Sequence, residues 1–318
     1  MLKYFMLGAA AFALTACGNK DVAQDAPALP EDGAVEAVDV VEKPAAENND
    51  GASGRLAEIL ARSDRGDDAA RDQYRHPAET LAFFGIEPGM TVAETLPGGR
   101  GWYTKILVPY LGAEGTLIGV NYSVEHWRNF GGFASPEFLE TQKTWPATFA
   151  AGWEERAGAA DATVTAFQFS GLPEDMKGTA DAVLFFRSLH HLNRFQDKGD
   201  FMTPALKDTM DVLKPGGIVA VVQHRGPEEN SDAWAVGDNG YLKESLVRQV
   251  FADAGFEFVS ESDVNANPKD RPTDDDAVWR LLPSLSTSGG EGQEELRAQM
   301  EAIGESDRMT LKFRKPTE

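Results

Sequence analysis

Cysteine is almost absent from this sequence, since Cys17 is the only one among 318 residues. A single cysteine excludes an internal disulfide framework and a metal site built from several thiolates. Cys17 therefore has to be explained by its own chemistry rather than by pairing within the chain.

Positive charge is scarce as well. The sequence holds 30 Lys and Arg against 51 Asp and Glu, which gives a formal net charge of -21. Binding of nucleic acid depends on a clustered excess of cationic side chains, so this charge argues against a nucleic acid partner. The same charge opposes adsorption to anionic lipid unless a covalent group holds the protein there. The apolar share of 42 % is ordinary, so a core of normal size is available.

The apolar run at the start of the chain covers residues 4–16 and follows Lys3. It is shorter than the roughly 20 residues that span a bilayer, but it suits the apolar region of a signal peptide. It ends in Leu14-Thr15-Ala16-Cys17, which resembles the lipobox of bacterial lipoproteins. The resemblance implies a signal peptide over 1–16, acylation of Cys17, and a periplasm-facing lipoprotein anchored to a membrane of the cell envelope. An ordinary signal peptide with an incidental cysteine is the alternative.

Residues 17–54 show no hydrophobic period and are rich in Ala, Pro, Asp, Glu and Asn. Acidic residues far outnumber Lys20 and Lys43. Such a segment buries too little apolar surface to offset the entropy of ordering it. We predict a disordered acidic linker over 17–54 and a single folded domain over 55–318.

From Arg55 onward, short apolar runs alternate with helical patterns, which predicts an α/β sheet with helices on both faces. The last predicted strand has polar residues on one side, as an edge strand would. The predicted strands are 91–94, 116–121, 163–167, 181–186, 218–223, 256–260 and 309–314, and the predicted helices are 102–111, 203–213, 243–254 and 294–303.

The first stretch that indicates function is the glycine-rich turn after the strand at 91–94. Glu94 ends that strand, Gly98, Gly99 and Gly101 follow, and a helix begins near Trp102. In doubly wound folds this turn lies at the crevice where nucleotides bind, because glycine lets the backbone approach a ligand. A tight turn that binds nothing is the alternative.

Three segments resemble the class I S-adenosylmethionine-dependent methyltransferases. The turn is similar to their first motif, an acidic residue followed by spaced glycines. The strand at 181–186, with the Arg187-to-Leu192 sequence RSLHHL after it, resembles their fourth strand, and Leu213-Lys214-Pro215-Gly216-Gly217 resembles the element before their fifth. The resemblance implies a Rossmann-like, seven-stranded, mostly parallel sheet whose last strand is antiparallel.

A narrower resemblance covers nearly all of 55–318. Segments 71–77, 97–103, 265–270 and 305–309 are similar to those of a bacterial group of predicted methyltransferases. Two departures from the general pattern stand out: Leu96 occupies the place of the first glycine, and Asn121 replaces the acid that usually binds the ribose.

The resemblance implies an S-adenosyl-L-methionine site. The turn would face the amino acid end of the cofactor, the end of the second strand its ribose, and the end of the third strand its adenine. The implied residues are Glu94, Pro97, Gly98, Gly99, Gly101, Trp102, Asn121, Phe167 and Gln168.

Methyl transfer from a sulfonium needs a nucleophile held in line and relieved of its proton, and it needs no metal. Histidine titrates near neutral pH, which suits a base. The candidate bases are His190, His191 and His224, with Tyr74, Tyr103 and Arg187 as positioning groups. Structural roles for all three histidines stay open at this point.

Other polar segments have plainer interpretations. Arg71, Asp72 and Arg75 are interpreted as a surface ion network on an early helix. The loop 265–270 either shapes the backbone or covers the substrate. Trp279 is interpreted as a core residue.

The leading hypothesis is a methyltransferase that acts on a small molecule or an envelope component. Export is the difficulty, because the cofactor is made in the cytoplasm. A non-catalytic envelope binding module with the same fold is the second hypothesis. A nicotinamide-dependent oxidoreductase is a third, which the LKPGG element and the extra last strand disfavour.

We expect growth with a tagged fatty acid to label the full chain and Cys17→Ser to abolish the label, because the acylated sulfur is then absent. Gel fluorescence of the purified protein measures this, and a labelled Cys17→Ser protein would contradict the lipoprotein assignment.

Overall fold

The structure is a computed structural model that describes residues 49–318. The predicted signal peptide, Cys17 and the predicted linker up to residue 48 lie outside the described residues. Within residues 49–318, no helix is long and apolar enough to cross a membrane.

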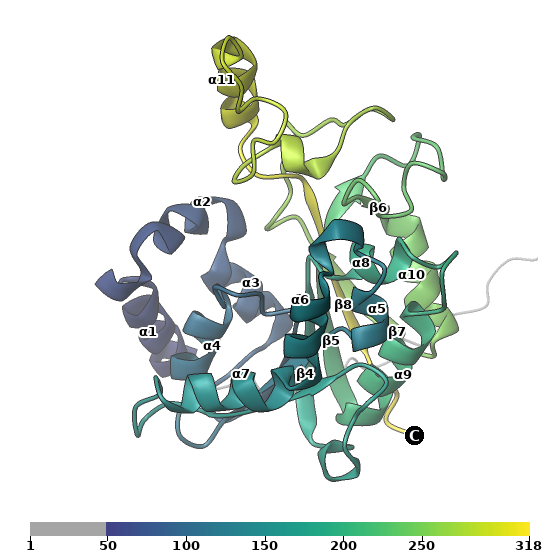
Figure 1. The fold of residues 1–318 in the computed structure, drawn as a ribbon. Helices are drawn as coiled ribbons and strands as arrows, with labels where there is room; N and C mark the ends of the chain where they lie inside the picture. The colour runs from purple at the N-terminus through teal and green to yellow at the C-terminus, as the bar shows by residue number, and fades with distance from the viewer. Residues whose placement is uncertain (1–48) are drawn as a thin grey trace, which may run out of the picture. The chain divides into compact units, whose positions relative to one another are not determined.

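The centre of the described part is a mixed sheet with the strand order β3-β2-β1-β4-β5-β8-β7 (Figure 1). All neighbours along this path are parallel except β8, which runs antiparallel to both β5 and β7. A two-residue strand, β6, pairs with the end of β5 off this path. The predicted mostly parallel sheet with an antiparallel last strand is confirmed. The strands are β1 (Thr91–Thr95), β2 (Thr116–Asn121), β3 (Thr163–Gln168), β4 (Ala180–Phe186), β5 (Leu213–Gly226), β6 (Leu242–Lys243), β7 (Glu257–Ser262) and β8 (Arg308–Arg314).

Helices connect the strands and cover the sheet. α3 begins with Pro77 in its first turn and ends at Gly85, whose φ of 73° suits glycine. The helices are α1 (Asn49–Leu60), η1 (Ser63–Arg71), α2 (Asp72–Arg75), α3 (Pro77–Phe84), α4 (Thr104–Leu111), α5 (Val124–Trp127), η2 (Gly131–Phe133), α6 (Pro136–Lys143), α7 (Trp145–Glu154), η3 (Glu174–Met176), α8 (Leu189–Asn193), α9 (Met202–Val212), α10 (Glu244–Asp253), η4 (Val278–Arg280) and α11 (Glu294–Ile303).

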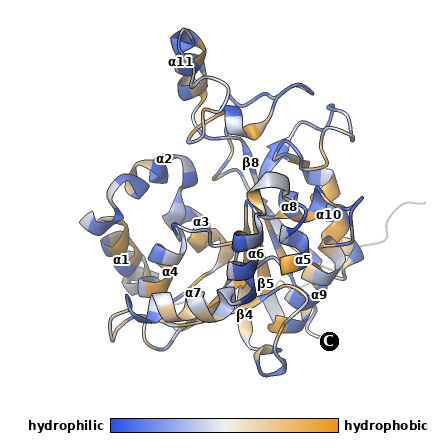
Figure 2. Cartoon of the chain, in the orientation of Figure 1, coloured by the Kyte–Doolittle hydropathy of each residue, from blue (hydrophilic) through white to orange (hydrophobic). Residues whose placement is uncertain are grey.

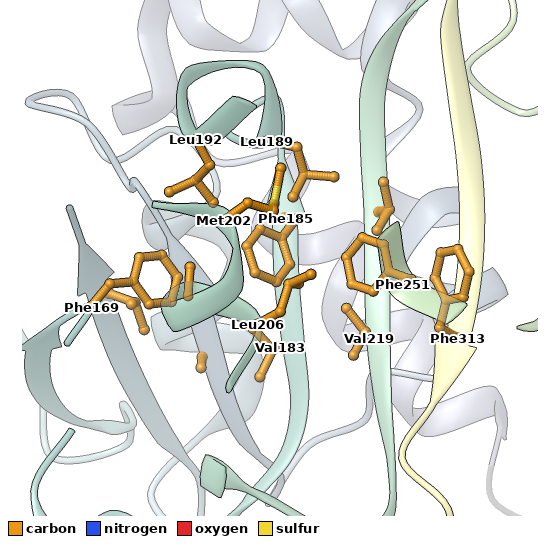
Figure 3. Packing of buried hydrophobic residues seen from close by; sticks show 14 of the residues in the cluster. Phe169, Val183, Phe185, Leu189, Leu192, Met202, Leu206, Val219, Phe251 and Phe313 are labelled. Atoms are coloured by element: carbon orange, nitrogen blue, oxygen red, sulfur yellow. The ribbon is translucent and has the colours of Figure 1, made fainter. Parts of the chain in front are cut away.

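The two faces of the sheet carry separate cores because side chains alternate along each strand. On β4, Ala182 and Leu184 pack with α1, α3 and α4, whereas Val183 and Phe185 pack with α8, α9 and α10. Figure 3 shows the second core, in which the Phe185 ring lies between those of Phe169 and of Phe251 on α10. Figure 2 shows the apolar residues gathered between sheet and helices, while α11 is largely hydrophilic and contributes no buried residue. Both cores hold the carboxyl ends of the parallel strands at one edge of the sheet.

The structure differs from the sequence prediction in helices that were not predicted, among them α3, α6 and α7, and at two boundaries. α1 begins at Asn49, six residues before the predicted start of the domain at 55. This helix was not predicted because it contains Gly51 and Gly54, and glycine is a poor helix former. β5 begins at Leu213 rather than 218, because Leu213 pairs with Ala180 before a register shift.

Candidate functional site

The turn after β1 is built around Glu94 and Leu96. Leu96 has φ +50°, a left-handed conformation that glycine adopts more readily. Leu96 thus adopts the left-handed backbone conformation that glycine usually adopts at this position of the turn. Gly98 and Gly101 also have positive φ, at +69° and +56°. The turn leads through Pro97 into α4.

Glu94 is the buried acid of this turn, only 4 % exposed. Its Oε2 accepts a hydrogen bond of 2.6 Å from the Thr104 hydroxyl. Burial raises the pKa of Glu94 to about 7, although the Thr104 hydrogen bond and the positive charge of Arg187 both act to lower it. No ion pair within 4.0 Å joins Glu94 to a cation among residues 49–318. The carboxyl group is therefore poised to ionise when a cationic ligand approaches.

A cavity of about 240 Å³ lies beside the turn, and Gly98, Gly99 and Gly101 form one of its walls. α7 forms the other wall, with Phe149 and Trp153. A Cβ added at Gly99 meets no atom within 4 Å, whereas one at Gly101 falls 2.8 Å from the Trp153 ring. The structure therefore brings the predicted glycine turn to a cavity, and Gly99 faces open space.

Asn121 ends β2, next to β1 in the sheet, and its side chain is buried. Its Nδ2 donates to Oε1 of Gln142 on α6 over 3.1 Å, and its Oδ1 accepts from the backbone N–H of Tyr122 over 2.8 Å. The amide that was predicted to face a ribose is thus paired with a second amide from the segment that folds over this end of the sheet.

The end of β3 carries the last two predicted cofactor residues. Phe167 is 2 % exposed and packs into the core, and Gln168 donates from Nε2 to the Tyr122 carbonyl over 3.0 Å. Both residues border an open cavity of about 360 Å³ together with Ser123 and Val124. Because β2 lies between β1 and β3 in the sheet, Asn121 at the end of β2 lies between the ends of these two strands.

Trp102 lies away from the glycine-lined cavity. Its Nε1 donates to the Asp68 carbonyl over 3.0 Å, and the Arg75 guanidinium stacks 4.6 Å from its ring centroid. The role of Trp102 in this structure is to pack the early helices against the start of α4.

The three candidate histidines come together at the carboxyl ends of β4 and β5. The ring centroids of His190 and His191 are 4.0 Å apart, and those of His190 and His224 are 5.6 Å apart. His190 Nδ1 lies 3.3 Å from Gln223 Oε1, and His224 Nδ1 lies 2.5 Å from the Ser306 hydroxyl.

Burial lowers the pKa of each of these histidines. The pKa of His190 falls to about 4, and those of His191 and His224 fall well below the usual value. For His224 the nearby His190, Arg308 and Arg187 lower the pKa further. All three rings are consequently neutral at pH 7, so they can accept a proton but are weak bases.

A buried ion cluster, which we call the arginine cluster, adjoins His224. It consists of Arg71, Arg75, Arg187 and Arg308 around Glu305. Oε1 of Glu305 accepts a hydrogen bond from Arg71 Nε over 2.6 Å. Its Oε2 accepts one from Arg75 Nε over 3.2 Å and also contacts Arg308 Nη2. Burial alone would raise the pKa of Glu305, but these guanidinium groups outweigh it and hold the pKa at about 2.

Tyr103 and Arg187, two predicted positioning residues, belong to the same region. The Tyr103 ring lies 4.4 Å from that of Phe186, the residue before Arg187. Burial raises the pKa of Tyr103 to about 12, although Arg75 and Arg187 act to lower it. Tyr74 contributes its backbone carbonyl, which accepts from Arg308 Nη1 over 2.9 Å.

The interpretation of Arg75 as a surface residue is wrong, because Arg75 is 2 % exposed. A short helix was expected to be solvated, but the segment between β7 and β8, which carries Glu305, and the start of β8, which carries Arg308, cover it. Glu305 and Arg308, which complete the cluster, were not predicted as site residues. The pairing of two arginines in segment 71–77 with an acid in segment 305–309 was the signal that could have found them.

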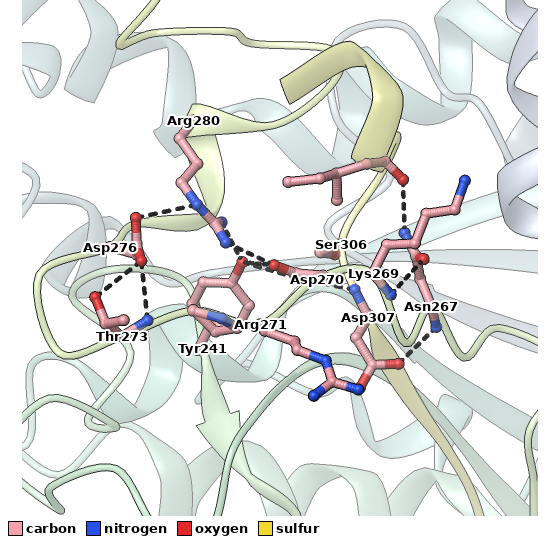
Figure 4. Close-up of polar contacts among 12 residues, drawn as sticks. Tyr241, Asn267, Lys269, Asp270, Arg271, Thr273, Asp276, Arg280, Ser306 and Asp307 are labelled. Carbon is pink, nitrogen blue, oxygen red and sulfur yellow. Dashed lines mark hydrogen bonds and ion pairs between the residues drawn. The ribbon is translucent and has the colours of Figure 1, made fainter. Parts of the chain in front are cut away.

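The loop 265–270 holds the Glu305 segment in place. Asn267 Nδ2 donates to the Glu305 carbonyl over 2.6 Å, and its backbone N–H donates to Asp307 Oδ1 over 2.7 Å. Figure 4 shows Asp270 between Tyr241, Arg280 and Asp307, with Arg280 Nη2 donating to Asp270 Oδ1 over 2.7 Å. Of the two interpretations of this loop, the structure favours a role in shaping the backbone.

Comparison with known proteins gives a likeness of fold at low identity. No protein family model matches the sequence, and no curated protein matches it. Solved structures do match. One is an S-adenosylmethionine-dependent methyltransferase from Aquifex aeolicus, with 16 % identity and a TM-score of 0.40 over 67 % of this chain and 93 % of that one. Another is geranyl diphosphate C-methyltransferase from Streptomyces coelicolor, solved with S-adenosyl-L-homocysteine, with 13 % identity and a TM-score of 0.43 over 82 % and 87 % of the two chains.

We predict that Glu305→Gln lowers the free energy of unfolding by about 3–5 kcal/mol, because it leaves buried guanidinium groups without their counter-charge. Urea denaturation measures the change. Glu257→Gln is the matched control, since Glu257 pairs with Arg314 at 2.6 Å but both side chains are about half exposed. The control should cost about 1 kcal/mol or less. Equal losses in the two variants would contradict the assignment of Glu305 as the buried counter-charge.

Proposed function

We propose that this protein is an S-adenosylmethionine-dependent methyltransferase whose acceptor is a small molecule or a component of the cell envelope. The observation that carries the proposal is the position of Glu94. A buried carboxyl group stands at the carboxyl end of the central strand β1, beside a glycine turn with room for a ligand, in a sheet with β8 inserted antiparallel between β5 and β7.

The residues at the turn fit such a cofactor in two respects. Glu94 has a carboxyl group that no cation neutralises among the described residues, which suits the ammonium of an amino acid. Gly99 leaves open space in the turn that leads into α4, where a cofactor carboxylate could be received. Glu94, Gly98, Gly99 and Gly101 would hold the amino acid end, and Asn121 and Gln168 the nucleoside end.

The bound cofactor would supply a methyl group on a positively charged sulfur. The protein's part is to orient the acceptor, exclude water and take up a proton. His190, His191 and His224 supply neutral imidazoles at the ends of β4 and β5. His224 is oriented through Nδ1 by the Ser306 hydroxyl. Its Nε2 is the atom we assign to receive the acceptor's proton.

We further propose that the protein is a lipoprotein of the bacterial envelope, anchored through Cys17. The lipobox-like sequence ahead of Cys17 and the acidic segment after it support this proposal. A covalent anchor would offset the repulsion between a strongly acidic protein and anionic lipid.

We expect Gly99→Val to weaken binding of S-adenosylmethionine at least tenfold while the fold stays intact, because the valine side chain fills open space beside the turn. Titration calorimetry on the full chain measures the affinity. Gly132→Val is the matched control: a Cβ there also meets no atom within 4 Å, but the residue lies in η2, away from the turn. Unchanged affinity in Gly99→Val, or no binding to the unmodified protein at millimolar cofactor, would overturn the assignment of the site.

The pKa of Glu94 predicts how cofactor affinity depends on pH. The carboxyl group must ionise to bind an ammonium, and its pKa of about 7 means that it is mostly protonated below pH 7. Affinity for S-adenosylmethionine should therefore fall about tenfold from pH 8 to pH 6. Glu94→Gln should bind more weakly and lose this part of the pH dependence. Parallel pH profiles for the two proteins would rule out Glu94 as the ammonium's partner.

A further inference from the structure

The arginine cluster carries more positive charge than its own acid neutralises. Arg71, Arg75 and Arg308 contact one carboxylate, Glu305, and Arg187 adds a fourth positive charge without contacting it, so three positive charges have no counter-charge in the cluster. Glu94 is the next acid in reach, and its pKa of about 7 leaves it only partly ionised. Buried charge without a partner is costly, so the cluster is incomplete as it stands.

Several N–H groups in the cluster also have no acceptor. Within the part of the chain that the structure describes, Nη1 and Nη2 of Arg75 and Nε of Arg308 are buried and make no hydrogen bond. The Arg75 side chain is 2 % exposed. Its stacking on Trp102, at 4.6 Å, satisfies the face of the guanidinium but leaves its in-plane N–H groups free. These groups require an acceptor that residues 49–318 do not provide.

Arg187 links the cluster to the glycine turn. It follows the last residue of β4 with φ +59°, an uncommon conformation for a residue with a side chain. Its charge lowers the pKa of both Arg75 and Glu94. The hydroxyl groups of Ser188 and Thr95, the residues after Arg187 and Glu94, lie 2.6 Å apart, so the end of β4 lies beside the turn. Among the described residues its side chain takes part in no ion pair within 4.0 Å. Unlike Arg75, Arg187 is only partly buried as a residue.

A bound anion can supply the missing counter-charge. A planar guanidinium matches a carboxylate or a phosphate through two parallel hydrogen bonds, and several guanidinium groups together favour such a group strongly. The proposed cofactor does not balance the cluster. Its sulfonium and ammonium charges outnumber its one carboxylate, so it adds net positive charge beside Arg187. A second, anionic molecule would balance both.

We propose that Arg75, Arg187 and Arg308 bind a carboxylate or phosphate group of the methyl acceptor, and that this protein therefore methylates an anionic substrate. That the bound anion is the methyl acceptor rests on the proposed function. Binding of an anion at this site rests only on the arginine cluster. An anion at this position would also lie beside His224 and favour protonation of its ring.

The first test uses inorganic phosphate as the probe and the full chain as the protein. Thermal unfolding is followed in a buffer poor in anions and with rising phosphate. The midpoint should rise by about 5 °C or more once phosphate reaches roughly a hundred times its dissociation constant. Arg187→Gln should lose most of this rise, and without phosphate it should be at least as stable as the unmodified protein, because it removes repulsion.

Arg314→Gln is the matched control, since Arg314 is half exposed on β8 and pairs with Glu257 outside the cluster. It should respond to phosphate as the unmodified protein does. Phosphate also stabilises folded proteins generally, and the difference between the two variants separates that effect from binding. An equal rise in Arg187→Gln, or no rise in any of the proteins, would overturn the anion site.

The second test uses S-adenosyl-L-homocysteine, which shares the amino acid end of the cofactor. If the cluster binds the acceptor, the affinity for S-adenosyl-L-homocysteine should stay within about threefold in Arg187→Gln and in saturating phosphate, measured at a pH that keeps Glu94 ionised in both proteins. Competition with phosphate would show that the cluster holds the cofactor's own carboxylate and would overturn the acceptor assignment. If S-adenosyl-L-homocysteine does not bind, but the rise of the unfolding midpoint with phosphate still depends on Arg187, the proposed function is wrong and the anion site is supported.

Discussion

The ion pairs of Glu305 with Arg71, Arg75 and Arg308 hold the helices before β1 against the segment between β7 and β8. Arg71 and Arg75 come from the helices before β1, whereas Glu305 and Arg308 come from the start of β8. One carboxylate thus joins segments that are 230 residues or more apart in the sequence. Ser306, the residue after Glu305, contacts His224 Nδ1 over 2.5 Å, so the Glu305 segment also reaches the end of β5.

Most of the sheet could be predicted from the sequence because its strands are short apolar runs that are buried on both faces. β2 begins and ends where its apolar run does, and the segment at 309–314 was recognisable as the last strand. The early helices were not predicted, since η1 is mostly polar and α1 contains two glycines. Their stability comes from contacts with α4 and with the Glu305 segment, which no local pattern reveals.

The candidate site was predictable only in part. The glycine turn and the three histidines were found because strand ends of a parallel sheet meet at one edge. The pairing of Asn121 with Gln142 was not, because α6 belongs to an insertion between β2 and β3 whose path the sequence does not specify. The burial of Arg75 depends on residues more than two hundred positions away, so its place in the cluster required the folded chain.

The bond between Asn121 and Gln142 has a kinetic consequence. A nucleoside that reaches the end of β2 has to separate two buried amides that already satisfy each other, so α6 must first move away from the sheet. Association would then saturate at high ligand concentration at the rate of that opening, instead of rising in proportion to concentration. Under the proposed function, a single hydrogen bond between two side-chain amides would therefore set the rate at which the connection between β2 and β3 admits the nucleoside.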